Sequence, residues 1–225
     1  MYLESMIFNK NKTKGLIRRD AANIIQHGFS APRYAERIWI NPSQVKFLLR
    51  GKDIVDDGKN RNRELSGFVF HGKWPHKKVI LVEEGKKISC CLSHWVDGVP
   101  WEETGIFEHM LYLIKERGTH DGCTNLADIK ERYQKLDKIF EETKKLGRLK
   151  TRKELKKNSF REEGGIYIHI GPQGKPYFGQ GGHHRFSIAK VLNIPFPAQV
   201  GIVHVDAISS LREFRYSGSH PGEVQ

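Results

Sequence analysis

FGQGGHHRFSIAKVLNI, residues 178–194, places two glycines, two histidines and Arg185 directly before an apolar pattern typical of a helix. A helix that needs only to be stable begins with Ser, Thr, Asp or Asn. This one begins with flexible backbone and basic side chains, where the helix dipole already favours negative charge. The arrangement costs stability unless an anion lies there, so we interpret the turn as an anion-binding helix start.

The segments around this turn alternate as strands do. Apolar residues alternate over 166–170 before a PQGK turn, and a second strand begins at 177–178. After the helix, 198–205 is an apolar strand, and earlier in the chain 38–40 alternates before Pro42 stops the pattern. We therefore expect these four strands to share one small mixed sheet in an α+β fold.

The long stretch between these strands is predicted to be largely helical. Residues 100–117 begin with a proline and early carboxylates and end at Gly118, as helices do. Residues 125–146 carry apolar side chains three and four apart, a stripe that we assign to core packing rather than to a partner helix. The segment 77–95 is expected to form one strand, a turn at 84–85, and a second strand or irregular segment.

These patterns predict an α+β core interrupted by a long, largely helical insertion. The expected regions are an N-terminal arm, 1–30; a core, 31–50 and 165–208; an inserted, mainly helical region, 51–164; and a flexible tail, 209–225.

The charge of the chain favours anionic partners. Its 225 residues carry a formal net charge of +12, which attracts nucleotides, nucleic acid or anionic glycans. Part of the excess is local, because the basic run 144–157, KKLGRLKTRKELKK, holds eight Lys or Arg and one Glu. This run is either a solvated helix end and linker or an anion-binding surface. We expect it to be exposed, beside or leading into the 178–194 turn.

Cysteine content and hydropathy predict a cytoplasmic protein. Three cysteines are too few for a disulfide scaffold, which fits a reducing compartment. A zinc site built from Cys90, Cys91, His94 and Cys123 is the alternative, but no CxxC pair is present and ordinary buried thiols are favoured. No run of about 18 apolar residues predicts a membrane span, and no secretory leader pattern opens the sequence.

The order strand, GGHHR, helix, Pro-x-Pro, strand resembles the ParB/sulfiredoxin fold, whose signature is a Gly-x-His-Arg or Gly-x-Arg-Arg turn that opens a helix. Residues 182–185 carry the GHHR form of ParB-like proteins. The resemblance covers 165–206 well and 36–50 more loosely, where IWINPSQV is similar to the first family strand. It implies a nucleotide at the turn, which is CTP in chromosome-partitioning proteins, ATP in sulfiredoxins, and ADP or ATP in free-serine kinases.

Three departures from the family narrow the expected function. Sulfiredoxins carry a Cys two residues before the Arg, and His183 stands there in this chain, which argues against peroxiredoxin repair. The serine kinases carry an Asp before the GHHR turn, where this chain has Gly181, so a catalytic base must come from elsewhere. Partitioning proteins continue into a helix-turn-helix domain, whereas only about 20 residues follow the last predicted strand here.

The resemblance assigns nucleotide binding to Gly181, Gly182, His183, His184 and Arg185. Glycines allow the backbone to approach a phosphate closely. The first amides of the helix point at the phosphate, and Arg185 supplies a charged contact while a histidine supplies a further donor.

Catalytic roles are assigned by the same resemblance to Glu36, His183 and His184. Glu36 precedes the first strand, as an acidic residue does in the serine kinases, and Glu103 and Asp206 are the alternatives for the base. No metal site made of protein ligands is predicted, and Mg²⁺ is expected to enter with the nucleotide.

Two main classes of function follow, and a third option is a nucleotide-gated scaffold that hydrolyses nothing. The first is a phosphotransferase or NTPase that uses a nucleoside triphosphate or diphosphate, ATP or ADP above others, with Mg²⁺ and an unidentified small-molecule or glycan acceptor. Phosphoryl transfer needs positioning and positive charge above all, which a basic cleft supplies. The alternative is a nucleic-acid-binding or nuclease-like ParB relative, favoured by the net charge and the basic run. The absence of a C-terminal DNA-binding pattern favours the enzyme.

Overall fold

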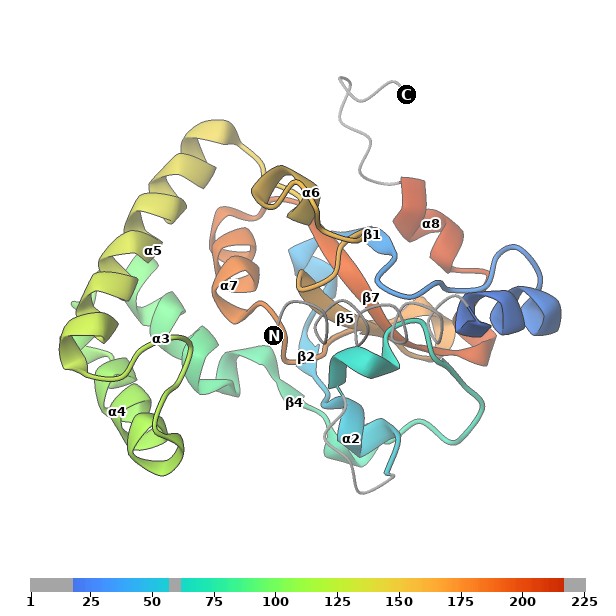
Figure 1. The fold of residues 1–225 in the computed structure, drawn as a ribbon, viewed down its shortest axis with the longest axis horizontal. Helices are drawn as coiled ribbons and strands as arrows, with labels where there is room; N and C mark the ends of the chain where they lie inside the picture. Colours follow the sequence, from blue (N-terminus) through green and yellow to red (C-terminus); the bar gives the residue numbers. More distant parts are fainter. Residues whose placement is uncertain (1–17, 57–61, 217–225) are drawn as a thin grey trace, which may run out of the picture.

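The computed structural model describes residues 18–56 and 62–216, and a seven-stranded mixed sheet lies at its centre (Figure 1). The strands are β1 Arg37–Ile40, β2 Phe47–Leu48, β3 Val69–Phe70, β4 Ile80–Leu81, β5 Ile166–Ile170, β6 Pro176–Phe178 and β7 Phe196–His204. The α-helices are α2 Gly51–Ile54, α3 Lys86–Trp95, α4 Ile106–Arg117, α5 Leu126–Leu146, α6 Arg152–Leu155, α7 His183–Leu192 and α8 Leu211–Tyr216, and residues 18–27 are also helical. The expected α+β class, with a mixed sheet, is confirmed.

β7 is the strand that joins the two halves of the sheet. Its first half pairs antiparallel with β1, where Ile38 faces Ala198, and its second half pairs parallel with β3. β7 also pairs parallel with β5, and the sheet continues in the order β5, β6, β2, β4. All nine residues of β7 are buried, as expected for a central strand that is covered on both faces.

The four strands expected from the sequence lie together in this sheet as β1, β5, β6 and β7. Two more strands, β3 and β4, come from 51–164, so this region adds to the sheet as well as forming helices. Each of them has only two residues, too few for an alternating pattern to show in the sequence.

Residues 86–95 form the helix α3, and the second strand or irregular segment expected within 77–95 is wrong. Ile and Trp favour strands locally, which made the segment resemble a strand. In the structure, Ile88, Leu92 and Trp95 recur at helical spacing and pack on the main core, and α3 lies against α7. The tertiary contact with α7 therefore outweighs the local strand preference.

One apolar cluster, the main core, joins the sheet to α7 and to parts of α3 and α5, and a second lies within the helical lobe, which consists of α3, α4 and α5. In the main core, Phe186 of α7 stacks on Phe178 with 4.6 Å between ring centroids and meets Phe196 edge-on at 5.7 Å. The second cluster joins the three lobe helices through buried side chains such as Met110 and Ile129. α7 lies between the sheet and the lobe (Figure 1).

Part of the expected flexible tail is a packed helix. α8 buries Leu211 and Phe214 on the main core beside β1, and Arg215 forms an ion pair with Glu36. Six residues with two buried apolar side chains give little helical signal in a sequence, because such a short helix depends on tertiary packing. Residues 217–225 of the expected tail lie outside the described residues.

The N-terminal arm is described only in part. Within this arm residues 18–27 form a short helix, and residues 1–17 lie outside the described residues. The helix is attached to the core, because Asn23 is buried and donates to the Gly67 carbonyl at 2.8 Å. Within the described residues, no helix has a stretch long and apolar enough to cross a membrane.

Candidate functional site

α7 begins at a turn that leaves its first amides without partners. Gly182 occupies the N-cap with φ +75° and ψ +37°, and it has no side chain to cap the helix. The amide of Phe186 donates to the Gly182 carbonyl at 2.9 Å. The amides of His183, His184 and Arg185 have no acceptor among the described residues. Open amides at the positive end of a helix dipole are suited to an anion.

Both glycines of the turn are required by packing. A Cβ on Gly181 would lie 2.8 Å from Arg63 Nη2 and 2.8 Å from the Cβ of Tyr167. A Cβ on Gly182 would lie 3.0 Å from Ile166 Cα, and the positive φ of Gly182 is one that other residues rarely adopt. These contacts with the start of β5 account for both glycines without a ligand, so a bulky substitution at either position tests folding rather than phosphate approach.

The two histidines do not supply the positive charge expected at this helix start. Burial, together with the field of Lys87, lowers the pKa of His183 to about 4. Burial, followed by the field of Arg132, lowers the pKa of His184 to about 3. His184 is buried against Tyr133, with 3.3 Å between its Nε2 and the hydroxyl, whereas His183 is only partly buried. Both imidazoles are therefore neutral at pH 7, and His183 is the more accessible of the two.

Positive charge reaches the turn from Arg63, which the sequence reasoning missed. Its guanidinium packs against Gly181 and is oriented by two hydrogen bonds, from Nη1 to Gln199 Oε1 at 2.7 Å and from Nη2 to the Gly165 carbonyl at 3.1 Å. Its charge also contributes to the lowered pKa of His183. Arg63 stands in a polar stretch that carries no recognisable motif, so only the fold reveals its position.

Lys87 of α3 is a second cation, and it forms an ion pair with the carboxylate of Asp121. Its Nζ lies 2.5 Å from Asp121 Oδ2 and 3.0 Å from His120 Nε2. Burial alone would raise the pKa of Asp121, but the hydrogen bond and charge of Lys87 hold it below its usual range. The charges of Lys87 and Asp121 both act on the pKa of His183 and of His184, and α3, which carries Lys87, packs on α7.

The sequence contained a weak signal for part of this group. His120 and Asp121 stand in GTHDG, 118–122, a glycine-flanked loop with two polar chemistry-bearing residues between two predicted helices. Asp121 has φ +50°, an uncommon value for a residue other than glycine. Lys87 was missed because its segment was expected to be a strand or irregular.

Arg185 points away from the open amides. Its Nη2 donates to the Lys150 carbonyl, and its Nη1 lies 4.0 Å from Oε1 of Glu162, which is 1% exposed. Glu162 Oε1 also accepts the amide of Arg152 at 3.0 Å, and burial raises the pKa of the Glu162 carboxyl. The guanidinium is thus part of a buried ion pair.

Glu36, the expected catalytic acid, is engaged in a different contact. Its Oε1 lies 2.5 Å from Nε of Arg215 in α8, and its Oε2 accepts the amide of Arg33 at 2.9 Å. These interactions hold the chain before β1 to α8. Among the described residues, no hydrogen bond or ion pair joins Glu36 to the turn at 181–185.

The structure does not bring the two alternative carboxylates to the turn either. Asp206 follows the end of β7 that pairs with Ile170, whereas the turn meets the opposite end of β5, where the Tyr167 amide donates to Gly181. Glu103 is exposed in a 3₁₀ turn of the helical lobe. Asp121 is the carboxylate whose charge acts on both motif histidines, so it replaces these candidates.

The cysteines are buried thiols, as favoured by the sequence. Cys90, Cys91 and Cys123 are free and buried, and Cys90 Sγ donates to the Thr104 carbonyl at 3.2 Å. Burial raises the pKa of Cys91 to about 12. Over residues 18–56 and 62–216, no group of three or more His, Cys, Asp or Glu is arranged to hold a metal ion, so the zinc alternative with His94 has no support.

Comparisons with protein families, curated proteins and solved structures give no match for this chain. The functional interpretation therefore rests on the geometry at the start of α7 and on the GHHR motif itself.

His169 and His184 predict that stability falls in acid. His169 is fully buried, and burial lowers its pKa to about 3. Both histidines stay neutral in the folded protein but take up a proton in the unfolded chain near pH 6.5. Their contribution to the free energy of unfolding is complete above about pH 6.5. It is lost as the pH falls toward the pKa values of the folded protein, by up to about 1.4 kcal/mol per pH unit for each histidine.

Urea denaturation between about pH 7.5 and pH 5 measures this dependence. His184→Asn, which cannot titrate, is expected to reduce the pH slope of the unfolding free energy by nearly one proton. An unchanged slope in His184→Asn would show that this imidazole titrates in the folded state.

Arg185→Ala is expected to destabilise the fold by about 3 kcal/mol, because it removes one of the two cations, Arg185 at 4.0 Å and Arg37 at 3.9 Å, that face the buried Glu162 carboxylate. Chemical denaturation of this variant measures the loss. The double variant Arg185→Met with Glu162→Gln removes both charges, and it is expected to recover much of the lost stability. Parental stability in Arg185→Ala is the result that would contradict the buried pair.

Proposed function

We propose that the start of α7 binds the phosphates of a nucleotide, and that the protein is a Mg²⁺-dependent phosphotransferase or NTPase of the ParB/sulfiredoxin fold. One observation carries the proposal. The open amides of 183–185 belong to a turn that packs against Arg63, and α3, whose Lys87 acts on the pKa of His183, packs on α7. The GHHR motif at 182–185 supports the nucleotide, of which ATP or ADP is the first choice.

The arrangement suits a phosphate because it presents fixed donors and positive charge together. Helix amides bind an oxyanion without reorganising. Arg63 is held by Gln199 and Gly165, and Lys87 is held by Asp121, so both charges are positioned before a ligand arrives. A bound phosphate would compete with Asp121 for Lys87.

His183 is the residue best placed to move a proton. Its pKa of about 4 leaves it neutral and able to accept a proton at pH 7, but weakly basic. An anionic phosphate beside it raises this pKa toward neutrality, which makes the imidazole a stronger base when the nucleotide is bound. We assign His183 to proton transfer from an acceptor hydroxyl or water, and buried His184 to holding α7 against Tyr133.

In this proposal, Asp121 and the phosphates of the nucleotide would hold Mg²⁺. Protein sites commonly hold it through one or two carboxylates together with substrate phosphates, and Asp121 is the carboxylate near the turn. When bound, the ion would neutralise charge on the transferred phosphoryl group.

Lys87→Met tests the proposal, because it removes the cation and keeps most of the side-chain volume. We expect nucleotide binding to weaken by about 1.5–3 kcal/mol, the scale of a hydrogen bond to a charged group. Isothermal titration of ATP, ADP, CTP and GTP with Mg²⁺ measures the change. Lys130→Met is the matched control, because Lys130 is exposed on α5 of the same lobe. If no nucleotide binds the parent, or if Lys87→Met binds as tightly as the parent, the proposal fails.

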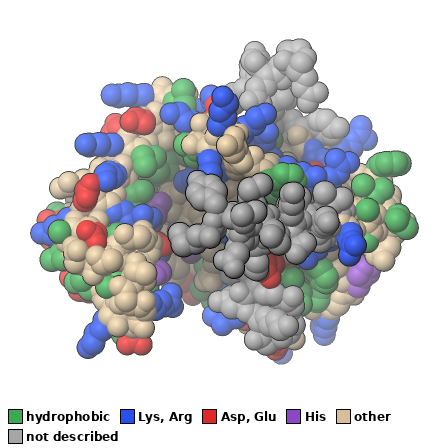
Figure 2. All heavy atoms as spheres, in the orientation of Figure 1, with side chains coloured by type: hydrophobic (Ala, Val, Ile, Leu, Met, Phe, Trp, Pro, Cys, Tyr) green, Lys and Arg blue, Asp and Glu red, His purple; other side chains and the backbone are tan. Residues whose placement is uncertain are grey.

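A second candidate function, binding of nucleic acid, is favoured by the basic run 144–157. Arg148 pairs with Glu154, and Arg152 donates to the Glu163 carbonyl at 3.2 Å. The other six basic side chains of the run are exposed, and Lys and Arg side chains stand out over the surface near α5 and α6 (Figure 2). These six are Lys144, Lys145, Lys150, Lys153, Lys156 and Lys157.

Reversal of four of these charges separates the two functions. Replacing Lys144, Lys153, Lys156 and Lys157 by Glu is expected to leave Tm nearly unchanged, because the side chains are exposed. Binding of duplex or single-stranded DNA or RNA near about 50 mM salt is then expected to weaken strongly if the run binds phosphates. No binding by the parent would exclude this second function while leaving the nucleotide site untouched.

A further inference from the structure

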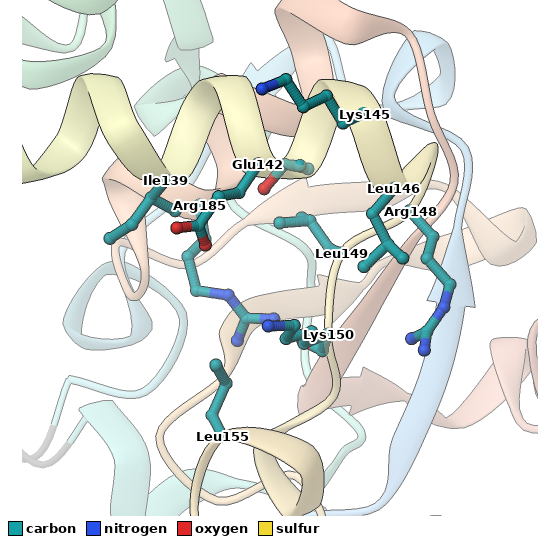
Figure 3. Close-up of a pocket in the computed structure, with 10 residues that line it drawn as sticks. Ile139, Glu142, Lys145, Leu146, Arg148, Leu149, Lys150, Leu155 and Arg185 are labelled. Atoms are coloured by element: carbon teal, nitrogen blue, oxygen red, sulfur yellow. The ribbon is translucent and has the colours of Figure 1, made fainter.

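A pocket of about 590 Å³ lies beside the nucleotide turn and is distinct from it (Figure 3). It is formed by the C-terminal half of α5, the connection 147–150 and α6, and it reaches Arg185 of α7. Its volume falls within the range of small-molecule sites, about 300–1,000 Å³. Of the residues at 181–185, Arg185 alone lines it, and this side chain points away from the open amides.

The walls of the pocket are apolar although much of their surface faces solvent. Leu149 is buried, whereas Ile139, Leu146 and Leu155 are 43%, 46% and 50% exposed. In Figure 3, aliphatic side chains from α5 and α6 surround the same space. Large apolar side chains gathered around one cavity favour a ligand with an apolar body, because its binding would remove their surface from water.

The charged residues of the pocket are mostly basic. Lys145, Arg148, Lys150 and Arg185 line it, against one acidic residue, Glu142. Among the described residues no ion pair involves Lys145 or Lys150, so their charge remains available to a ligand. A basic set beside apolar walls is complementary to an anion with an aliphatic body and repels an amphipathic cation.

Arg185 gives the pocket a positioned cation rather than a mobile one. Its side chain is 18% exposed and is held by the Lys150 carbonyl. Its Nη1 is buried with no hydrogen-bond partner, since Glu162 Oε1 is 4.0 Å away. This buried atom is closed to a ligand, but the guanidinium lines the pocket and its positive charge attracts an anion there.

We propose that this pocket binds an organic anion, with its carboxylate or phosphate head group at Lys150 and Arg185 and its aliphatic body against Ile139, Leu146 and Leu155. The ligand class follows from apolar walls and basic side chains in one cavity. Nucleic acid fits less well, because it offers phosphates but no aliphatic body for these walls. The site does not depend on nucleotide binding at the start of α7.

Isothermal titration with matched ligands tests the proposal on the full chain, at concentrations below those at which the ligands form micelles. Decanoate and decyl phosphate share a tail and differ in the head group, so they distinguish an acyl carboxylate from an alkyl phosphate. Decyltrimethylammonium tests the sign of the charge, and inorganic phosphate tests the head group alone. We expect at least one decyl anion to bind, and to bind about tenfold or more tighter than the cation and inorganic phosphate.

Two variants locate the binding site. Leu155→Glu places a negative charge on the apolar wall, and Lys150→Glu reverses a charge at the proposed head-group position. Each is expected to weaken binding of the decyl anion by about tenfold or more. Leu126→Glu is the matched control, because Leu126 is 41% exposed at the other end of α5 and lies outside the pocket. It is expected to bind as the parent does.

Three results would overturn the proposal. They are the absence of binding by both decyl anions, equal binding of decyltrimethylammonium, and an equal loss of binding in Leu126→Glu and Leu155→Glu. Failure of ATP or ADP to bind would leave this proposal standing, because neither pocket variant replaces a residue of the turn at 181–185. The link to the turn is that Arg185 donates a hydrogen bond to the backbone carbonyl of Lys150.

Discussion

The close contact between Gly182 and the start of β5 is the constraint on which the candidate site depends. With 3.0 Å between a would-be Cβ and Ile166 Cα, only glycine lets the chain turn there with a positive φ. The turn fixes where α7 begins, and the stacking of Phe186 on Phe178 then fixes how α7 lies on the sheet. The open amides are a consequence, because a glycine N-cap has no side chain to satisfy them.

The helical lobe completes the surroundings of α7. Asp137 of α5 accepts the indole N–H groups of Trp95 and Trp101, at 3.0 and 2.9 Å, and so ties α3 and the following turn to α5. This places Lys87 near the start of α7 and Tyr133 against His184. α7 consequently has two chemically different sides, one with open amides near Lys87 and one where Arg185 enters an apolar, basic pocket.

The site itself was only partly predictable. The GHHR turn, the helix after it and the open amides at its start follow from adjacent residues. The protonation of the histidines does not, because burial under the lobe lowers the pKa of His183 to about 4 and of His184 to about 3. The ion pair of Arg185 was not predictable from adjacent residues either, because its partner Glu162 lies 23 positions earlier in the chain and is buried.

Patterns within short stretches were sufficient for the four main strands, for the helix expected over 125–146 and for the turn, because alternation and helical spacing are local properties. The helix expected over 100–117 ends where the sequence indicated but begins only at Ile106, after a 3₁₀ turn at Trp101–Glu103. Contacts between distant segments decided the rest. α3 is helical because it packs on α7, and α8 is helical because it packs against β1. The approach of Arg63 to the turn and the effect of Lys87 and Asp121 on its histidines arise only in the tertiary structure, since fields and hydrogen bonds depend on distance in space and not on separation along the chain.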